Sequence, residues 1–222
     1  MVLNYYMNII DTSANLKDSS LDNSIENIPL FEIKPVEYEI SDSLTSDIIF
    51  QSVASVKHFK HFEICKKINV FAMGESTKRA LEKIGIDSTT PGIPGSSSLK
   101  ELLGKKLMNR KFAIVKGLDG LDEVHDHVIK YGAYAENIVC YKRKKFFSYE
   151  DIREKFNKAD IVIFSSNFAA ELFFENIYIS DSEISFVCIS ERIKEYISKL
   201  GYEAKTINYF SDDLLNEIKK TI

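Results

Sequence analysis

The sequence predicts an α/β fold made of two similar lobes, each with a mainly parallel β-sheet flanked by helices. Short apolar runs alternate with helical patterns along most of the 222 residues, which is typical of this class. One order of segments also occurs twice, more than a hundred residues apart. That repeat indicates two lobes of common ancestry.

Strands are expected at the short apolar runs, with helices between them. Residues 88–98, STTPGIPGSSS, are expected to form a loop. The charged segment 141–150 has no core-forming period and is expected to be a connector, and the first 27 residues show the weakest pattern. The expected strands are Ile28–Ile33, Asp47–Phe50, Asn69–Ala72, Phe112–Val115, Asn137–Cys140, Ile161–Phe164, Ser185–Ile189 and Glu203–Ile207.

Three helices have particular signals. Ser98 and Glu101 have the spacing of a capping box, which predicts a helix start. Acids in the first turn and lysines in the last predict a helix over 211–220. A further helix is expected to bury one stripe of apolar side chains: Leu121, Val124, Val128 and Ile129.

The repeat begins with DIIFQSVASVKHF at Asp47–Phe59 and with DIVIFSSNFAAELFF at Asp160–Phe174. Each phrase opens with Asp, continues as a strand, reaches a Ser and then becomes helical. A second strand follows in both copies, then a small residue (Gly74 or Ser190), then Glu and a helix. Each of these helices ends at a glycine eleven positions later, which suits the left-handed conformation of a C′ residue.

Ligands of open α/β sheets bind at the carboxyl edge, where strands lead into helices. We therefore expect the two edges to face each other, with the ligand in a cleft between the lobes. Free backbone N–H groups at helix starts attract carboxylates or phosphates. The alternative is that Ser and Thr at these positions only cap helices. The candidate binding residues are Ser52, Gly74, Ser76, Thr77, Lys116, Gly117, Ser165, Ser166 and Ser190, expected at helix starts, with their neighbours Val53, Glu75, Asn167 and Arg192.

Composition limits the classes of function. The contents of 45% hydrophobic and 28% charged residues are ordinary for a globular protein. A net charge of −4 provides no overall positive field for nucleic acid. No apolar run reaches the roughly 18 to 20 residues of a membrane span, and the N-terminus lacks the pattern of a signal peptide. Three widely spaced cysteines, expected as reduced and partly buried thiols, favour the cytoplasm.

Signals for metals and nucleotides are weak. His58 and His61 fit one helix face, whereas His125 and His127 do not, and no Cys or acidic partner completes a ligand set at familiar spacing. The glycine motifs of phosphate loops and dinucleotide sites are absent from the sequence. The basic run Lys142–Lys145 either steers a polyanion or is a solvated surface. We expect neither a metal nor a cofactor.

An ordered set of segments carries a resemblance to a known family. The sequence resembles uroporphyrinogen-III synthase, the cyclising enzyme of tetrapyrrole biosynthesis, over nearly everything from residue 28 to 210. No single segment is diagnostic, but the set in this order is specific. The segments are IPLFEIKPVE, DIIFQSVASV, VFAMGESTKRALEKIG, KFAIVKG, YGAYAENIVCY, DIVIFSSNFAAELFF and the weaker FVCISERIKEYISKLG.

The resemblance implies two α/β lobes joined by two connector strands. The inner lobe would be residues 38–138, and the outer lobe would combine residues 1–32 with 146–222. The connector strands would be 33–37 and 139–145. One lobe is therefore expected to be discontinuous in sequence.

The resemblance also implies a substrate and a reaction. The substrate would be hydroxymethylbilane, a linear tetrapyrrole with eight carboxylates, received from hydroxymethylbilane synthase. Loss of its hydroxyl as water gives a cationic azafulvene. Attack by the last pyrrole ring forms a spiro intermediate, which recloses with this ring inverted to give uroporphyrinogen III. Because the substrate supplies both reacting groups, the protein mainly binds and orients it. We expect a cytoplasmic monomer.

Three residues match functional positions of the family. Tyr141 matches the tyrosine that donates a proton to the leaving hydroxyl, and a phenol with a pKa of about 10 can do so without a metal. Ser166 matches a serine that contacts a carboxylate, and Thr77 matches the threonine of a Gly-x-x-Thr helix start. The alternative for Tyr141 is a tyrosine packed at a domain seam.

The sequence also departs from the family pattern. Asp11–Ser13 stands where the family often has Thr-Arg-Pro, so the usual basic residue is missing, and the helix expected over 16–25 is short and polar. Ile193 replaces a second threonine and offers no hydroxyl, although Arg192 offers a guanidinium. These changes affect the outer lobe most. Two alternatives to a synthase are a non-catalytic two-lobed small-molecule binding protein and a degenerate synthase homologue.

Overall fold

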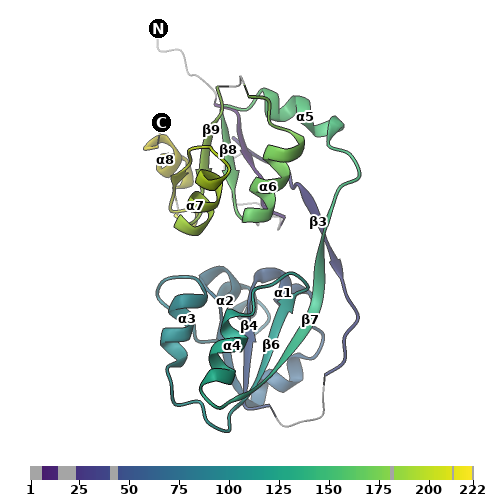
Figure 1. Ribbon diagram of the computed structural model, residues 1–222, viewed down its shortest axis with the longest axis vertical. Helices are drawn as coiled ribbons and strands as arrows, with labels where there is room; N and C mark the ends of the chain where they lie inside the picture. The colour runs from purple at the N-terminus through teal and green to yellow at the C-terminus, as the bar shows by residue number, and fades with distance from the viewer. Residues whose placement is uncertain (1–6, 15–23, 41–44, 181–182, 212, 222) are drawn as a thin grey trace. The chain divides into compact units, whose positions relative to one another are not determined.

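The computed structural model describes residues 7–14, 24–40, 45–180, 183–211 and 213–221. The chain divides into two compact units (Figure 1). Unit 1 consists of Met1–Glu32 with Lys144–Ile222, and unit 2 consists of Ile33–Arg143. There are two five-stranded, mainly parallel sheets flanked by helices, so the predicted α/β class is confirmed. The lobe boundaries and the separate connector stay predictions.

Strands and helices alternate along unit 2. They are β3 (Phe31–Pro35), β4 (Asp47–Phe50), α1 (Val53–His58), the 3-10 helix η1 (Phe62–Lys67), β5 (Asn69–Ala72), α2 (Glu75–Glu82), α3 (Ser96–Leu103), β6 (Lys111–Gly117), α4 (Glu123–Lys130) and β7 (Tyr134–Lys145). The sheet order is β3-β7-β6-β4-β5. Strand β4 pairs in parallel with β5 and β6, and β6 pairs in parallel with β7. Strand β3 lies beside β7, as Figure 1 shows.

Unit 1 repeats this alternation. Its elements are β1 (Ile9–Asp11), β2 (Ile25–Asn27), α5 (Glu150–Asn157), β8 (Ile161–Phe164), α6 (Asn167–Asn176), β9 (Ser185–Cys188), α7 (Glu191–Lys199), β10 (Lys205–Thr206) and α8 (Leu214–Lys219). The sheet order is β10-β9-β8-β1-β2, and all four strand pairs are parallel. The shortest strand, β10, lies at one edge.

Side chains cover both faces of the unit 2 sheet. One face packs on α1, α2 and η1 around Phe50 and Leu81, and the other packs on α3 and α4 around Leu99. Because successive residues of a strand point to opposite faces, Ala113 and Ile114 of β6 enter different clusters. In Figure 1, α4 crosses in front of β6. Burial on both faces explains why these strands are continuous apolar runs.

Two kinds of core side chain stabilise unit 1. Ile9 of β1 and Ile218 of α8 belong to one aliphatic cluster. Aromatic rings form another contact set, in which Phe173 of α6 lies 5.3 Å from Phe164 of β8 and 5.7 Å from Phe186 of β9, between ring centroids. Tilted and edge-on pairs of this kind contribute about 0.5–1.5 kcal/mol each beyond the burial of their area. They hold α6 against the strands that precede and follow it.

The predicted repeat is present as β4-α1-β5-α2 in unit 2 and as β8-α6-β9-α7 in unit 1. Ser52 and Ser166 are the N-caps of α1 and α6, and each side chain accepts a hydrogen bond from the N–H three residues later. Gly85 and Gly201 have φ angles of 78° and 91°, which is the predicted left-handed conformation. In sheet order, β8 and β9 correspond to β4 and β5.

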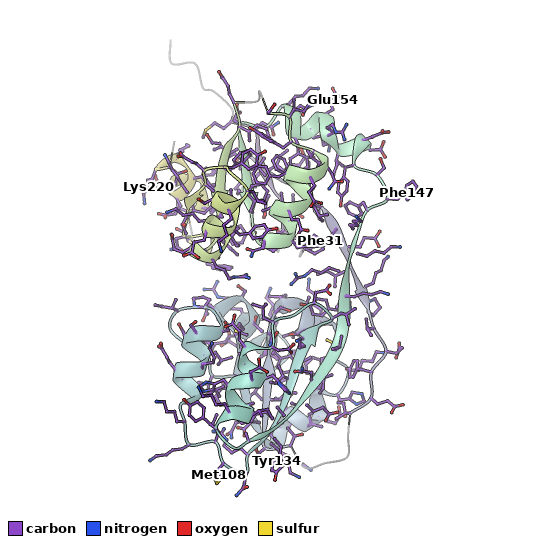
Figure 2. All side chains as sticks on the ribbon, in the orientation of Figure 1. Phe31, Met108, Tyr134, Phe147, Glu154 and Lys220 are labelled. Carbon is purple, nitrogen blue, oxygen red and sulfur yellow. The ribbon has the colours of Figure 1, made fainter. Side chains whose placement is uncertain are left out.

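Some expected strands are wrong in extent. The run at Ile28–Ile33 is not one strand, because β2 ends before it and β3 begins within it. Strand β7 runs from Tyr134 to Lys145 and is longer than the expected Asn137–Cys140, because it pairs with β6 and with β3. The basic run Lys142–Lys145 therefore lies in a strand, as the family resemblance implied. Beyond β7, Phe147 is fully exposed and points away from the ribbon (Figure 2). The helix expected over 16–25 lies almost entirely outside the described residues.

Two expectations about helices are also wrong. The N-cap of helix α3 is Gly95, three residues before the predicted cap Ser98, so the helix begins at Ser96. In α4 the buried stripe is narrower than expected. Val124 and Val128 are buried, whereas Leu121 and Ile129 are exposed, since Leu121 precedes the helix and Ile129 lies on its outer face. A helix of eight residues therefore covers this face with only a few side chains.

A buried ion pair closes the amino end of the unit 2 sheet. Asp47, the first residue of β4, is fully buried and accepts hydrogen bonds from Arg110, Ser46 and Asn69. Burial raises the pKa of Asp47, but the hydrogen bonds outweigh it, so this pKa lies below its usual value. The Arg110 guanidinium also lies 5.0 Å from the centre of the Phe112 ring. A single carboxylate thus joins β4 to the first residue of β5 and to the residue that precedes β6.

We predict that Arg110→Met destabilises the protein by about 3–5 kcal/mol near neutral pH, because it leaves a buried carboxylate without its cation. Denaturant unfolding measures this, with Arg79→Met as the control, since Arg79 pairs with Glu75 on an exposed helix face. A lowered folded pKa contributes stability that is present above the unfolded pKa of about 4 and is lost as the pH falls through the folded pKa. The penalty should therefore shrink in acid. Equal, small effects of both variants would contradict the assignment.

Candidate functional site

In each sheet, two neighbouring strands are followed by connections that lead to opposite sides of the sheet. In unit 2 the chain passes from β4 through α1 to β5, and from β6 through α4 to β7 on the other side. Ala54 of α1 and Val124 of α4 pack on opposite faces of the sheet. Open α/β sheets bind ligands at the carboxyl ends of two such strands. We call the carboxyl ends of β4 and β6 the unit 2 switch point, and those of β8 and β1 the unit 1 switch point.

Tyr141 lies at the unit 2 switch point. Its hydroxyl is 2.9 Å from Oγ of Ser52, the residue that caps α1, and its side chain is almost fully buried. The pairing of β6 with β7 is irregular here, since Lys116 pairs with Val139 but Gly117 pairs with Tyr141. The extra residue turns the tyrosine onto the glycine, as bulges near functional sites often do.

Gly117 makes room for that tyrosine. A Cβ atom at this position would lie 2.6 Å from Cζ and 2.7 Å from Cε2 of Tyr141. Gly120 is similarly close to the polar groups of the switch point, because a Cβ there would lie 2.9 Å from Cε of Lys116 and 3.1 Å from Oε1 of Gln51. The end of β6 and the turn after it can therefore pack against Tyr141, Lys116 and Gln51 only because positions 117 and 120 are glycines.

Lys116 is a buried cation at the same edge. Its side chain is 4% exposed, and its Nζ lies 2.6 Å from Oδ1 of Asp122, whose own side chain is 56% exposed. The hydrogen bond from Lys116 is the main reason why the pKa of Asp122 lies below its usual value, and a second bond from Asn137 adds to it. Lys116 and Gly117 lie within β6, so their expected position at a helix start is wrong, because pairing with β7 extends the strand through them.

The turn after β5 holds four more of the predicted residues. Gly74 is the N-cap of α2, and Pro94 would lie 2.8 Å from a Cβ at this position. Glu75 pairs with Arg79 at 3.2 Å, so its carboxylate faces a cation of its own helix. Thr77 is buried, whereas Ser76 is half-buried. Gly74 offers no side chain to cap α2, so the first-turn N–H groups are not occupied by a capping side chain.

Ser165, Ser166 and Asn167 follow β8 at the unit 1 switch point. Oγ of Ser166 accepts a hydrogen bond from the N–H of Ala169 at 3.1 Å, so Ser166 is a helix cap, as the structural alternative for this serine requires. Oδ1 of Asn167 is buried and has no hydrogen-bond partner within the described part of the chain. The two serines and the asparagine are half-buried.

Asp11 lies opposite these residues, at the end of β1. It is buried, and its carboxylate accepts hydrogen bonds from the N–H and hydroxyl of Ser13 and, at 2.6 Å, from the hydroxyl of Tyr209. Burial and the neighbouring carboxylate raise the pKa of Tyr209 far above its usual value, so the phenol stays protonated. Asn27 of β2 donates to the Asp11 and Ser13 carbonyls. By register, Asp11 corresponds to Ile114 of β6, so unit 1 has a buried anion two residues before the position of Lys116.

The turn after β9 has Ile193 at the position that Thr77 holds in its counterpart after β5. Ser190 is the N-cap of α7 but its side chain makes no capping hydrogen bond. Ile193 is buried in the core, whereas Arg192 is exposed. The structure therefore brings Ser52, Gly117 and Tyr141 into contact, with Lys116 next to Gly117 on β6. It places the predicted residues after β5, β8 and β9 at separate turns. Val53 is the first residue of α1 and offers its backbone.

Sequence reasoning missed several polar residues at these edges. Gln51 directly follows β4, and a polar residue at that position was a usable signal. Asp122 pairs with Lys116 across the turn after β6, and Asn137 reaches Asp122 from β7. Tyr209 is 198 residues away from Asp11, so no local pattern indicated that contact. The buried thiols at 65, 140 and 188 are free, and burial raises the pKa of the first two to about 11.

Other features of the described residues lie away from this edge. A pocket of about 630 Å³ lies along α7, β9 and β10, lined by residues such as Ser185 and Glu203 at the amino ends of these strands. That is the end opposite to the one where α/β sheets bind ligands. Among the described residues, no cluster of three His, Cys, Asp or Glu side chains could hold a metal ion, and no helix is long and apolar enough to cross a membrane.

We predict that Gly117→Ala displaces the Tyr141 ring and lowers the free energy of unfolding by about 1–3 kcal/mol, as overpacking does. Gly92→Ala is the matched control, because no atom lies within 4 Å of the Cβ it would add. Thermal unfolding of both variants measures the difference. An unchanged melting temperature for Gly117→Ala, with the Tyr141–Ser52 contact intact in a crystal structure, would contradict this packing.

Solved structures with the same fold include uroporphyrinogen-III synthases. The uroporphyrinogen-III synthetase of Helicobacter pylori 26695 is similar with a TM-score of 0.71 at 13% identity, over 97% of this chain and 99% of that one. A mutant uroporphyrinogen III synthase of the extremely thermophilic bacterium Thermus thermophilus has a TM-score of 0.63 at 11% identity, over 96% and 98% of the two chains. At 11–13% sequence identity, this similarity shows only that the fold is shared. Comparison with curated proteins finds no match.

The family model described as Uroporphyrinogen-III synthase HemD matches residues 20–209. The match begins after β1 and includes both serine caps, the whole unit 2 switch point and Tyr141. It spans well over half of the chain. The chain therefore belongs to the uroporphyrinogen-III synthase HemD family.

Proposed function

We propose that this protein is a uroporphyrinogen-III synthase, a hydro-lyase that cyclises hydroxymethylbilane with inversion of the last pyrrole ring. The observation that supports this most is the Tyr141 hydroxyl at the unit 2 switch point, hydrogen-bonded to Ser52, in a chain of this family. We further propose that the protein receives its substrate from hydroxymethylbilane synthase and acts in the cytoplasm as a monomer.

The Tyr141–Ser52 pair supplies an acid for the departure of the substrate hydroxyl. Oγ of Ser52 accepts the N–H of Ser55 at 3.0 Å and has its own proton for the phenol oxygen. The Tyr141 proton then goes to the leaving hydroxyl, the C–O bond breaks and water departs. The Ser52 hydroxyl stabilises the phenolate that remains. A proton returns when the final ring closure restores the aromatic pyrrole, so acid and base balance over one turnover.

Binding of the carboxylates falls to backbone N–H groups and a few cations. The first turns of α2 and α7 are not occupied by capping side chains, and a helix N-terminus attracts anions. Ser166 and Asn167 start α6, and the Asn167 amide can donate a hydrogen bond to a carboxylate. Leu118 and Leu121, on either side of Gly120, are exposed and offer apolar contact to pyrrole rings. Such a surface suits an amphiphilic polycarboxylate.

A non-catalytic homologue is the second candidate, and Asp11 favours it. A buried carboxylate at the unit 1 switch point repels substrate carboxylates, although hydrogen bonds from the neutral hydroxyls of Ser13 and Tyr209 stabilise it. A two-lobed binding protein without catalysis shares the fold but has no need of the Tyr141 hydroxyl. The two candidates differ in product formation.

The first test generates hydroxymethylbilane in place, adds the protein and separates the oxidised porphyrin isomers. We expect mainly isomer III, because only an enzyme that inverts the last ring gives it. Isomer I alone, the product of spontaneous closure, would contradict synthase activity and favour the non-catalytic homologue.

The second test replaces the proposed acid. Tyr141→Phe should slow the formation of isomer III by about a hundredfold or more, since general acids contribute factors of this size, while the fold stays intact. Tyr149→Phe is the control, because Tyr149 is also buried and its hydroxyl donates only to the Leu30 carbonyl. Equal rates for both variants would refute the role of Tyr141.

A further inference from the structure

Lys116 and Asp122 form an unequal pair. The ammonium is buried and fixed on β6, whereas the carboxylate that neutralises it lies on the surface, in the turn before α4. Moving an unpaired ammonium out of water is costly, so a buried lysine requires an anion next to it. The exposed partner, by contrast, can leave its position and be solvated at little cost. The structure requires an anion at this place, but not this particular anion.

A second donor points at the same oxygen. Nδ2 of Asn137, on β7, lies 3.0 Å from Oδ1 of Asp122, and Nζ of Lys116 lies 2.6 Å from it. Two donors on neighbouring strands therefore converge on one carboxylate oxygen. This is the arrangement by which proteins hold a carboxylate with charge-assisted hydrogen bonds. Lys116 directly precedes Gly117, against which the Tyr141 ring packs.

Asp122 does not make the helix-capping hydrogen bond that its position allows. It is the N-cap of α4, a position where an aspartate normally accepts N–H groups of the first turn. Its side chain makes no such capping bond, because its oxygen is turned to Lys116 and Asn137. An aspartate released from Lys116 therefore has a second place to go, at the start of its own helix.

We propose that Lys116 and Asn137 form a binding site for a ligand carboxylate, which Asp122 occupies in the free protein and vacates when the ligand binds. This rests on the proposed function, since it assigns one subsite for a carboxylate of the tetrapyrrole. Asp122 acts as a built-in competitor. It keeps the buried ammonium neutralised while the site is empty and makes small monocarboxylates poor ligands. On release it can cap α4, which favours the ligand-bound state.

The test measures binding of uroporphyrin III, a stable octacarboxylate, by fluorescence titration. Asp122→Asn removes the competing carboxylate and should tighten binding about three- to tenfold. The ligand then no longer has to replace the charge-assisted hydrogen bond between Lys116 and Asp122. Lys116→Met should weaken binding about tenfold or more. Glu123→Gln is the matched control, because it removes one negative charge from the neighbouring residue, which pairs with Lys100 instead. It should change the affinity less than twofold.

Equal tightening by Asp122→Asn and Glu123→Gln would overturn the proposal, since the loss of one negative charge from this surface would then explain the effect. So would tightening by neither, or a lack of uroporphyrin binding altogether. If Asp122→Asn fails to fold, a pH titration of the wild-type protein replaces it. The NMR shift of the Asp122 carboxyl carbon should then give a pKa closer to that of an ordinary aspartate when uroporphyrin is bound. An unchanged titration would overturn the proposal. The isomer assay judges the synthase activity independently of all these outcomes.

Discussion

The register shift between β6 and β7 is the constraint on which the rest of the site depends. One extra residue on β7 puts Tyr141 rather than Cys140 opposite Gly117. The shift occurs where β6 adjoins β4 at the unit 2 switch point, so the phenol meets the Ser52 hydroxyl. Without it, the alternation of a regular strand would turn Tyr141 to the other face of the sheet. Glycine at 117 is then required by space alone, since the ring occupies the position of any Cβ.

The two units show how one scaffold can carry different chemistry. Both use a serine N-cap after the first strand of the repeat and a glycine in left-handed conformation after the second helix. At the neighbouring strand, unit 2 has a buried cation with a replaceable partner, whereas unit 1 has a buried anion held by Ser13 and Tyr209. A polycarboxylate ligand would therefore find its side-chain cation in unit 2, and mainly backbone N–H groups in unit 1. Because of this asymmetry, we propose that the chemistry takes place in unit 2.

Local sequence patterns predicted the fold class and the repeat, whereas strand pairing and long-range contacts determined the partners of the site residues. The serine caps, Gly85, Gly201 and the alternation of strands and helices follow from neighbouring residues, so the fold class and the repeat were predictable. Lys116 and Gly117 were expected at a helix start because a lysine and a glycine after an apolar run are typical of a turn, whereas pairing with β7 keeps them in the strand. The partners of Lys116 and Asp11 depend on register and on contacts across many residues, which no local pattern specifies.

The central claim is that the carboxyl edge around Tyr141 is where this protein meets its ligand. Backbone and side-chain NMR shifts, recorded while uroporphyrin III is added, test it most directly. The account predicts the largest changes at Ser52, Gly117 and Tyr141, with further changes at the starts of α2, α6 and α7. Changes confined to the pocket along β9 and β10, with Tyr141 unaffected, would contradict it.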